Sequence, residues 1–179
     1  PSSNLLAFYN TSGTLNNNFT FSKAADNFNF RGSYSNLDIQ GLFPGSSLKR
    51  NLLNGSSSVD LNNKRTFGAN INYLTQNLLG EFDDTYSNQS TGSFSSWFHR
   101  DLDINKLKEL RNLRSPEGIL ASWNHKNPDG YSGNASWYAG NYWYNPYSYF
   151  DNVKNETRRD RLYGDVSLTY KINSDLKIR

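Results

Sequence analysis

The clearest period-two pattern in the chain is Thr66-Phe67-Gly68-Ala69-Asn70-Ile71-Asn72-Tyr73. Apolar side chains occupy every second position, and Thr, Gly and Asn fill the positions between them. Because successive side chains of a β-strand point to opposite faces, this spacing predicts a strand with one apolar and one polar face. Similar alternation predicts further strands at Asn18–Ser22, Phe28–Tyr34, Leu53–Leu61 and Leu162–Ile172, and one that begins near Leu176.

The segments that connect these strands differ strongly in length. Tight polar turns are expected at Lys23–Asn27, Asn62–Lys64 and Asn173–Asp175, and much longer connections at 36–49 and at about 75–161. In an up-and-down meander alternate connections share one end, so the short turns and the long loops would lie at opposite ends, as in transmembrane barrels. Predicted strands of about 8 to 11 residues also suit a tilted barrel strand.

The composition favours an ordered chain with much polar surface. Hydrophobic residues make up 35% of the 179 residues and aromatic residues 15%, and the mean hydropathy is -0.79. Chains that stay unfolded are poor in aromatic residues, so these values favour a polar, aromatic-rich β-protein.

Charges are spread along the chain, and the formal net charge is +3. Such spreading is not typical of nucleic-acid binding, and the one basic group, Arg158, Arg159 and Arg161, is interpreted as part of a solvated loop. The chain has no cysteine. It begins at Pro1 without an apolar signal segment, so we interpret it as an internal part of a longer protein.

The apolar strand face has two possible partners, protein or lipid. Alternation alone favours a soluble β-sandwich or barrel whose apolar face points inward. Two features favour a membrane barrel instead: the polar face carries few Lys or Glu, and Tyr34, Tyr73 and Tyr170 stand at strand ends, where aromatic girdles belong. We therefore predict an all-β fold, an antiparallel up-and-down transmembrane β-barrel of which this chain supplies about six strands.

One short helix is expected inside the longest connection. Asp103 can cap a segment with apolar residues on adjoining positions, and Ser115-Pro116 would end it. The apolar positions of this helix are Ile104, Leu107, Leu110 and Leu113.

Several motifs follow one another over nearly the whole chain. Near the start stands Phe8-Tyr9-Asn10-Thr11-Ser12-Gly13-Thr14. Next come Phe30-Arg31-Gly32-Ser33-Tyr34-Ser35-Asn36 and Gly41-Leu42-Phe43-Pro44-Gly45-Ser46-Ser47-Leu48-Lys49-Arg50-Asn51. Later motifs are Trp97-Phe98-His99-Arg100-Asp101-Leu102-Asp103, Trp123-Asn124 with Asn127-Pro128, Tyr144-Asn145-Pro146-Tyr147 and Asp160-Arg161-Leu162-Tyr163-Gly164. Taken in this order, they resemble the SusC/RagA family of TonB-dependent outer-membrane transporters in Bacteroidetes.

The resemblance implies that residues 1–179 are part of the β-barrel domain of a TonB-dependent receptor, with about 75–161 as a long extracellular loop. It also implies an outer-membrane location, contact with membrane lipid, and energy from the TonB complex through a plug domain that this chain lacks. A SusD-like surface lipoprotein would be a partner, and the substrate would be an oligosaccharide or a peptide. Family members have many more strands than the six predicted here. About six strands cannot close a barrel, so this chain would form only part of one.

Two sets of side chains are candidates for contact with water or substrate. The predicted lumen-facing residues are Asn29, Arg31, Asn70, Asn72 and Asp165. The predicted substrate-binding residues of the long loop, whose rings suit sugar faces or peptide backbones, are Trp137, Tyr138, Tyr142, Trp143, Tyr144 and Tyr147. The same aromatic residues could instead pack the loop against itself, because a loop of this length needs a core of its own.

No catalytic group, metal site or cofactor is expected. His99-Arg100-Asp101 matches the opening of a kinase catalytic loop, but the Gly-rich loop and the Asp-Phe-Gly motif of a kinase are missing. We therefore expect active import of oligomeric nutrients rather than an enzyme. The alternative is a secreted or surface glycan-binding β-module, in which the loop aromatics would form the binding face.

Overall fold

The computed structural model describes residues 2–80, 99, 101–116, 118–124 and 145–179. The chain divides into two compact units. We call them the sheet unit, made of Gly13–Ile39, Leu48–Leu78 and Thr157–Arg179, and the loop unit, made of Pro1–Ser12, Gln40–Ser47 and Leu79–Glu156.

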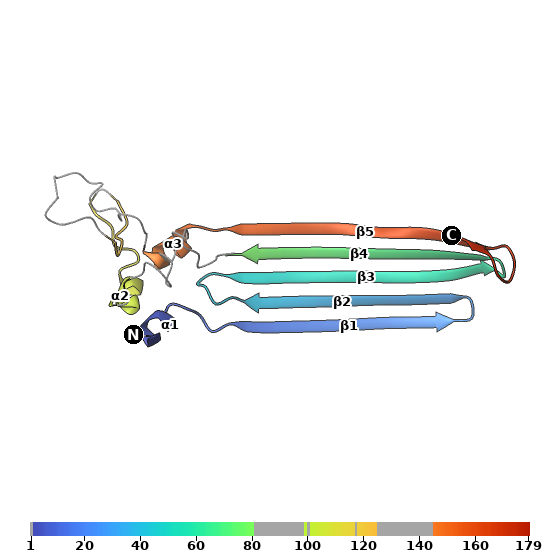
Figure 1. Ribbon diagram of the computed structural model, residues 1–179, viewed down its shortest axis with the longest axis horizontal. Helices are drawn as coiled ribbons and strands as arrows, with labels where there is room; N and C mark the ends of the chain where they lie inside the picture. The colour runs from blue at the N-terminus through green and yellow to red at the C-terminus, as the bar shows by residue number, and fades with distance from the viewer. Residues whose placement is uncertain (1, 81–98, 100, 117, 125–144) are drawn as a thin grey trace. The chain divides into compact units, whose positions relative to one another are not determined.

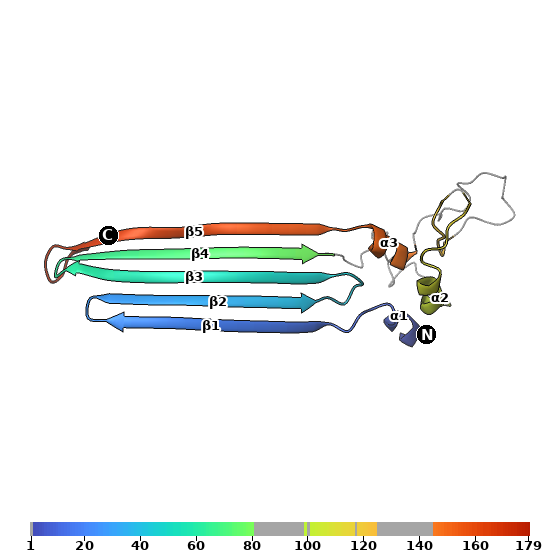
Figure 2. The same ribbon diagram turned by 180° about the vertical axis from the view of Figure 1, so that it is seen from behind.

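The sheet unit is an up-and-down antiparallel meander. Its six strands pair in chain order, and Figures 1 and 2 show β1 to β5 side by side from the front and from behind. β5 pairs antiparallel with β6, with Tyr170 opposite Ile178. The prediction of an all-β, up-and-down fold is confirmed, and the described sheet is open, with β1 and β6 at its edges. The strands are β1 (Gly13–Ala25), β2 (Phe28–Gln40), β3 (Ser47–Asn62), β4 (Arg65–Leu79), β5 (Glu156–Lys171) and β6 (Lys177–Ile178).

The five long strands are longer than predicted. β1 and β2 have 13 residues, β4 has 15, and β3 and β5 have 16, so the expectation of about 8 to 11 is wrong. The reason is a change of phase: in β2, Phe28 and Phe30 lie on one face, whereas Leu37 and Ile39 lie on the other. The predicted long connection at 36–49 is therefore a short one, residues 41–46.

The strands beside the longest connection also extend beyond their predicted ends. β4 continues to Leu79 and β5 begins at Glu156, so the connection covers residues 80–155 rather than about 75–161. Arg158, Arg159 and Arg161 are exposed, but they belong to β5 and not to a loop. The prediction failed because the first residues of β5 are charged on both faces and show no apolar alternation.

Among the described residues of the loop unit there are three short helices: α1 (Ser2–Leu6), α2 (Ile104–Glu109) and α3 (Pro146–Asn152). The predicted cap of α2 is confirmed, because the Asp103 carboxylate accepts from the backbone N–H groups of Asn105 and Lys106. The helix ends earlier than predicted, and Leu113 lies beyond it with 53% of its surface exposed. Within the described residues, no helix has the length and hydropathy to cross a membrane.

The loop unit has a small aromatic core. Phe8 is 1% exposed, and its ring centroid lies 5.2 Å from that of Tyr147 and 5.7 Å from that of Phe150. Ile104 and Leu107 of α2 complete the buried set. Phe43, in the connection between β2 and β3, packs against these residues, so the N-terminal segment and two connections of the sheet contribute to one core.

Candidate functional site

Side-chain contacts across the strands fix which residues share a face of the sheet. The rings of Phe21 and Phe30 lie 6.1 Å apart, and the Arg65 guanidinium lies 5.9 Å from the centre of the Tyr170 ring. Together with the period-two alternation, these pairs define what we call the aromatic face. Its large apolar residues are Leu15, Phe19, Phe21, Phe28, Phe30, Tyr34, Leu53, Val59, Leu61, Phe67, Ile71, Tyr73, Leu162, Val166, Leu168 and Tyr170.

The opposite face, here called the amide face, carries hydrogen-bonded polar side chains. The Asn29 Nδ2 group donates to Ser58 Oγ at 2.6 Å, and the Asn70 Nδ2 group donates to Asp165 Oδ1 at 3.1 Å. The five predicted lumen-facing residues all lie on this face, spread over three strands: Asn29, Arg31, Asn70, Asn72 and Asp165.

The large apolar side chains of the aromatic face are mostly exposed, whereas those of a globular core are buried. Val166 is 75% exposed, Leu162 69%, Phe19 66% and Ile71 54%. Soluble monomers rarely expose contiguous apolar patches of more than a few hundred Å², and such patches mark contacts with membranes or other proteins. An apolar surface that extends over five strands therefore needs an apolar partner.

A shallow groove crosses the aromatic face at two glycines, which have no side chain to fill it. Gly55 of β3 and Gly164 of β5 line it, together with Phe30, Ile71 and Val166. A side chain at Gly164 would overlap the backbone carbonyl of Asn70, so β4 and β5 approach each other closely at this point. Glycine is required here for close packing rather than for an unusual backbone angle.

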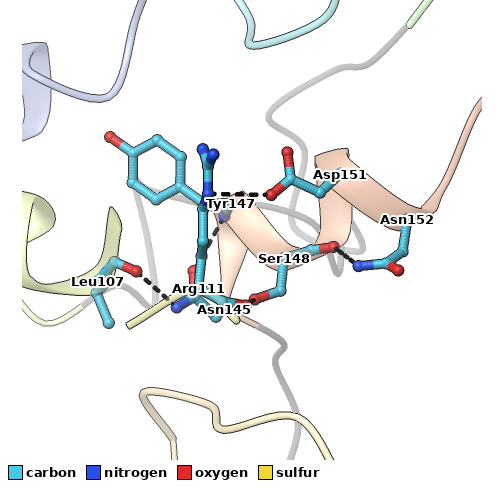
Figure 3. A network of polar contacts seen from close by, with 7 residues as sticks. All are labelled: Leu107, Arg111, Asn145, Tyr147, Ser148, Asp151 and Asn152. Atoms are coloured by element: carbon cyan, nitrogen blue, oxygen red, sulfur yellow. Dashed lines mark hydrogen bonds and ion pairs between the residues drawn. The ribbon is translucent and has the colours of Figure 1, made fainter. Parts of the chain in front are cut away.

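In the loop unit, a polar network joins α3 to α2 and to the segment that follows α2, as Figure 3 shows. The Asn145 side chain accepts from the Tyr147 N–H at 3.0 Å and donates to the Leu107 carbonyl at 2.9 Å. The Ser148 hydroxyl donates to the Arg111 carbonyl, and the Arg111 Nε lies 3.4 Å from the Asp151 carboxylate. Asn145 is 2% exposed, so it is the buried centre of this network.

Of the predicted substrate-binding residues, the structure describes Tyr147 alone. It is 5% exposed, and its hydroxyl donates to the Ala7 carbonyl at 3.4 Å, so most of its ring packs inside the loop unit. Burial raises the pKa of its phenol above the usual value, and the nearby Arg111 guanidinium opposes this rise. Outside the described residues lie Trp137, Tyr138, Tyr142, Trp143 and Tyr144.

Replacement of Asn145 by Ala should loosen the loop unit. The change removes the cap of α3 and leaves the Leu107 carbonyl without its donor, which together should cost about 1 to 3 kcal/mol. Hydrogen exchange should then show faster exchange of the α2 and α3 amides. Asn152→Ala is the matched control, because Asn152 is exposed and caps no helix start. Equal exchange in the two variants would contradict the assigned role.

The hydrogen-bonding roles of two asparagines were not predicted from the sequence. Asn51 binds three neighbouring side chains on the aromatic face, a role that its place at the end of the Gly41 to Asn51 motif does not indicate. Asn145 did have a signal, because Asn followed by Pro is a typical helix start, with Asn at the cap and Pro in the first turn.

Comparisons of the chain with models of known protein families and with curated protein sequences gave no match. Among the described residues, no group of three His, Cys, Asp or Glu side chains could hold a metal ion. The functional argument therefore rests on the open meander and on the difference between its two faces.

Proposed function

We propose that this chain forms part of the wall of an outer-membrane β-barrel, in a TonB-dependent transporter of the SusC/RagA type. The observation that carries the proposal is the exposed aromatic face. Its apolar side chains would contact acyl chains, while the amide face would border a hydrated lumen. Hydrocarbon tolerates only helices and closed barrels, so further strands would have to join both edges of the sheet.

In this proposal the protein imports oligosaccharides or peptides, and no bond of the substrate is broken. Asn29, Arg31, Asn70 and Asp165 would hydrate the lumen or meet a plug domain, which would transmit energy from the TonB complex. The loop unit would face the cell exterior and a SusD-like surface lipoprotein. Its aromatic core gives such a loop a defined shape, as a surface that holds a partner or an incoming substrate requires.

A soluble glycan-binding module is the competing function. It would need a second layer to cover the aromatic face, since a soluble sheet places its apolar face against a core. Residues such as Val166 and Leu162 remain mostly exposed, which favours the membrane proposal.

Extraction and gel migration test the proposal on the intact protein that contains this chain. An outer-membrane barrel should sediment with outer membranes, need detergent for extraction, and migrate differently on gels before and after boiling. Deletion of the gene should then abolish growth on one oligomeric nutrient and leave growth on its monomer unchanged. A protein that is released without detergent and migrates identically in both samples would overturn the proposal.

A further inference from the structure

The aromatic face changes character along its strands. We call the end of the sheet where β2 passes into β3 the loop end, and the end where β1 passes into β2 the turn end. On β2, this face carries Phe28 and Phe30 near the turn end, then Tyr34, and then Asn36 and Asp38 near the loop end. On the neighbouring strands, the corresponding loop-end positions of the face are Lys49, Asn51, Thr75 and Asp160.

A row of hydrogen-bonded side chains marks the change. Tyr34 Oη donates to Asn51 Oδ1 at 2.7 Å, and Asn36 Nδ2 donates to the same oxygen at 2.8 Å. The Asn51 Nδ2 group donates in turn to Thr75 Oγ1 at 3.3 Å. The row crosses three strands, β2 to β4, and so it follows one level of the sheet rather than one strand.

Beyond this row, on β2, β3 and β5, the aromatic face carries charged side chains. Asp38 and Lys49 form an ion pair at 3.6 Å, and Arg158 and Asp160 form another at 3.2 Å. The side chains of both pairs are 45% exposed or more. Exposed charges of this kind are strongly disfavoured in hydrocarbon. Between the row and the turn end, this face carries no charged side chain from Phe28 to Tyr34 or from Phe67 to Tyr73, and its charged residues Lys23 and Arg65 stand at the turn end itself.

The amide face changes in the opposite sense at the same level. On β2, β3 and β4 its polar residues largely give way near the loop end to half-buried aliphatic side chains, whereas on β5 this face carries the exposed Arg159 and Arg161 there. The aliphatic residues are Leu37, Ile39, Leu48, Leu52, Leu74 and Leu78. A polar outer surface over an apolar inner surface is the arrangement of a β-sheet in water. On β2, β3 and β4 the two halves of the strand therefore match two different surroundings.

We propose that the bilayer covers the aromatic face only from the turn end to the level of Tyr34 and Tyr73, and that the loop-end part of the strands stands in water. The inference rests on the proposed membrane location, and it adds the level along the strands at which the bilayer ends. A tilted strand needs about 9 to 11 residues to cross the hydrocarbon. The segment from Arg65 to Tyr73 supplies this span, and β4, with 15 residues, continues well beyond it.

Site-directed labelling tests the boundary, and the absence of native cysteine makes the labels unique within this chain. Single cysteines would replace Ile71 and Asn77 on β4, and Val166 and Arg158 on β5, each carrying a polarity-sensitive fluorophore. All four positions lie on the aromatic face, one on each side of the boundary on each strand. The intact protein would be placed in phosphatidylcholine vesicles that contain either a nitroxide-labelled lipid or aqueous iodide.

Labels at Ile71 and Val166 should be quenched by the nitroxide lipid and protected from iodide, and labels at Asn77 and Arg158 should show the reverse. If all four labels are quenched by lipid, the inference is wrong and the membrane location stands. If none is quenched by lipid while the labelled proteins remain folded, the proposed function fails and the inference fails with it. Both sides of the boundary are labelled on β4 and again on β5. If a variant on one strand does not assemble, the labels on the other strand still decide the test.

Discussion

Val166→Arg should prevent assembly of the protein into the outer membrane. Val166 is the most exposed large apolar residue of the sheet, at 75%, and it lies well inside the uncharged part of the aromatic face. An arginine on the lipid face near the middle of the bilayer costs about 2–4 kcal/mol. Because folded proteins are only marginally stable, a cost of this size should sharply reduce the boiling-sensitive folded band in outer-membrane fractions.

Thr169→Arg is the matched control, because Thr169 lies on the same strand and on the amide face. In a hydrated lumen an added arginine is tolerated, so this variant should assemble at close to the normal level. The soluble alternative also predicts a loss of stability for Val166→Arg, because its second layer would bury this residue, so the two proposals are separated by the extraction test rather than by this variant. Normal assembly of Val166→Arg would count directly against lipid contact.

The turn-side half of each strand could be predicted from the sequence, because there the apolar residues stay in one phase. From Phe67 to Tyr73 every second residue is apolar, and this segment is indeed a strand. The loop-side half could not be found in this way, because Leu37 and Ile39 continue the strand with the opposite phase. A search for one continuous apolar face therefore places a loop where the strand in fact continues.

The loop unit shows a different limit of prediction from sequence. α2 was predicted because Asp103 is a strong cap and the apolar residues after it have helical spacing, whereas no helix was predicted at α1 or α3. Their stability comes from contacts between distant segments, such as that between Phe8 and Tyr147, which no local pattern encodes. Tyr147, for which the sequence left substrate contact and packing open, is buried and contacts Phe8 of the N-terminal segment.

Gly164→Val should destabilise the sheet itself. A β-carbon at this position would overlap the Asn70 carbonyl oxygen and come within 3.1 Å of the Ile71 Cα, and both of these are backbone atoms that cannot rotate away. β4 and β5 would have to separate, which weakens their ladder and the neighbouring bond between Asn70 and Asp165. Forced overpacking typically costs about 1–3 kcal/mol, so the temperature at which the folded gel band is lost should fall by several degrees.

Gly13→Val provides the comparison, because a β-carbon at Gly13 has no atom within 4 Å. Valine also favours strands, so this variant should keep the thermal stability of the parent protein. Gly55→Ala should fall between the two, since its β-carbon would meet the Ile71 side chain at 3.1 Å and that side chain can shift. If Gly164→Val were as stable as Gly13→Val, the close approach of β4 and β5 would be disproved. The expected loss of thermal stability thus increases from Gly13 to Gly55 to Gly164. This order depends on the atoms around each glycine and holds whether or not the sheet lies in a membrane.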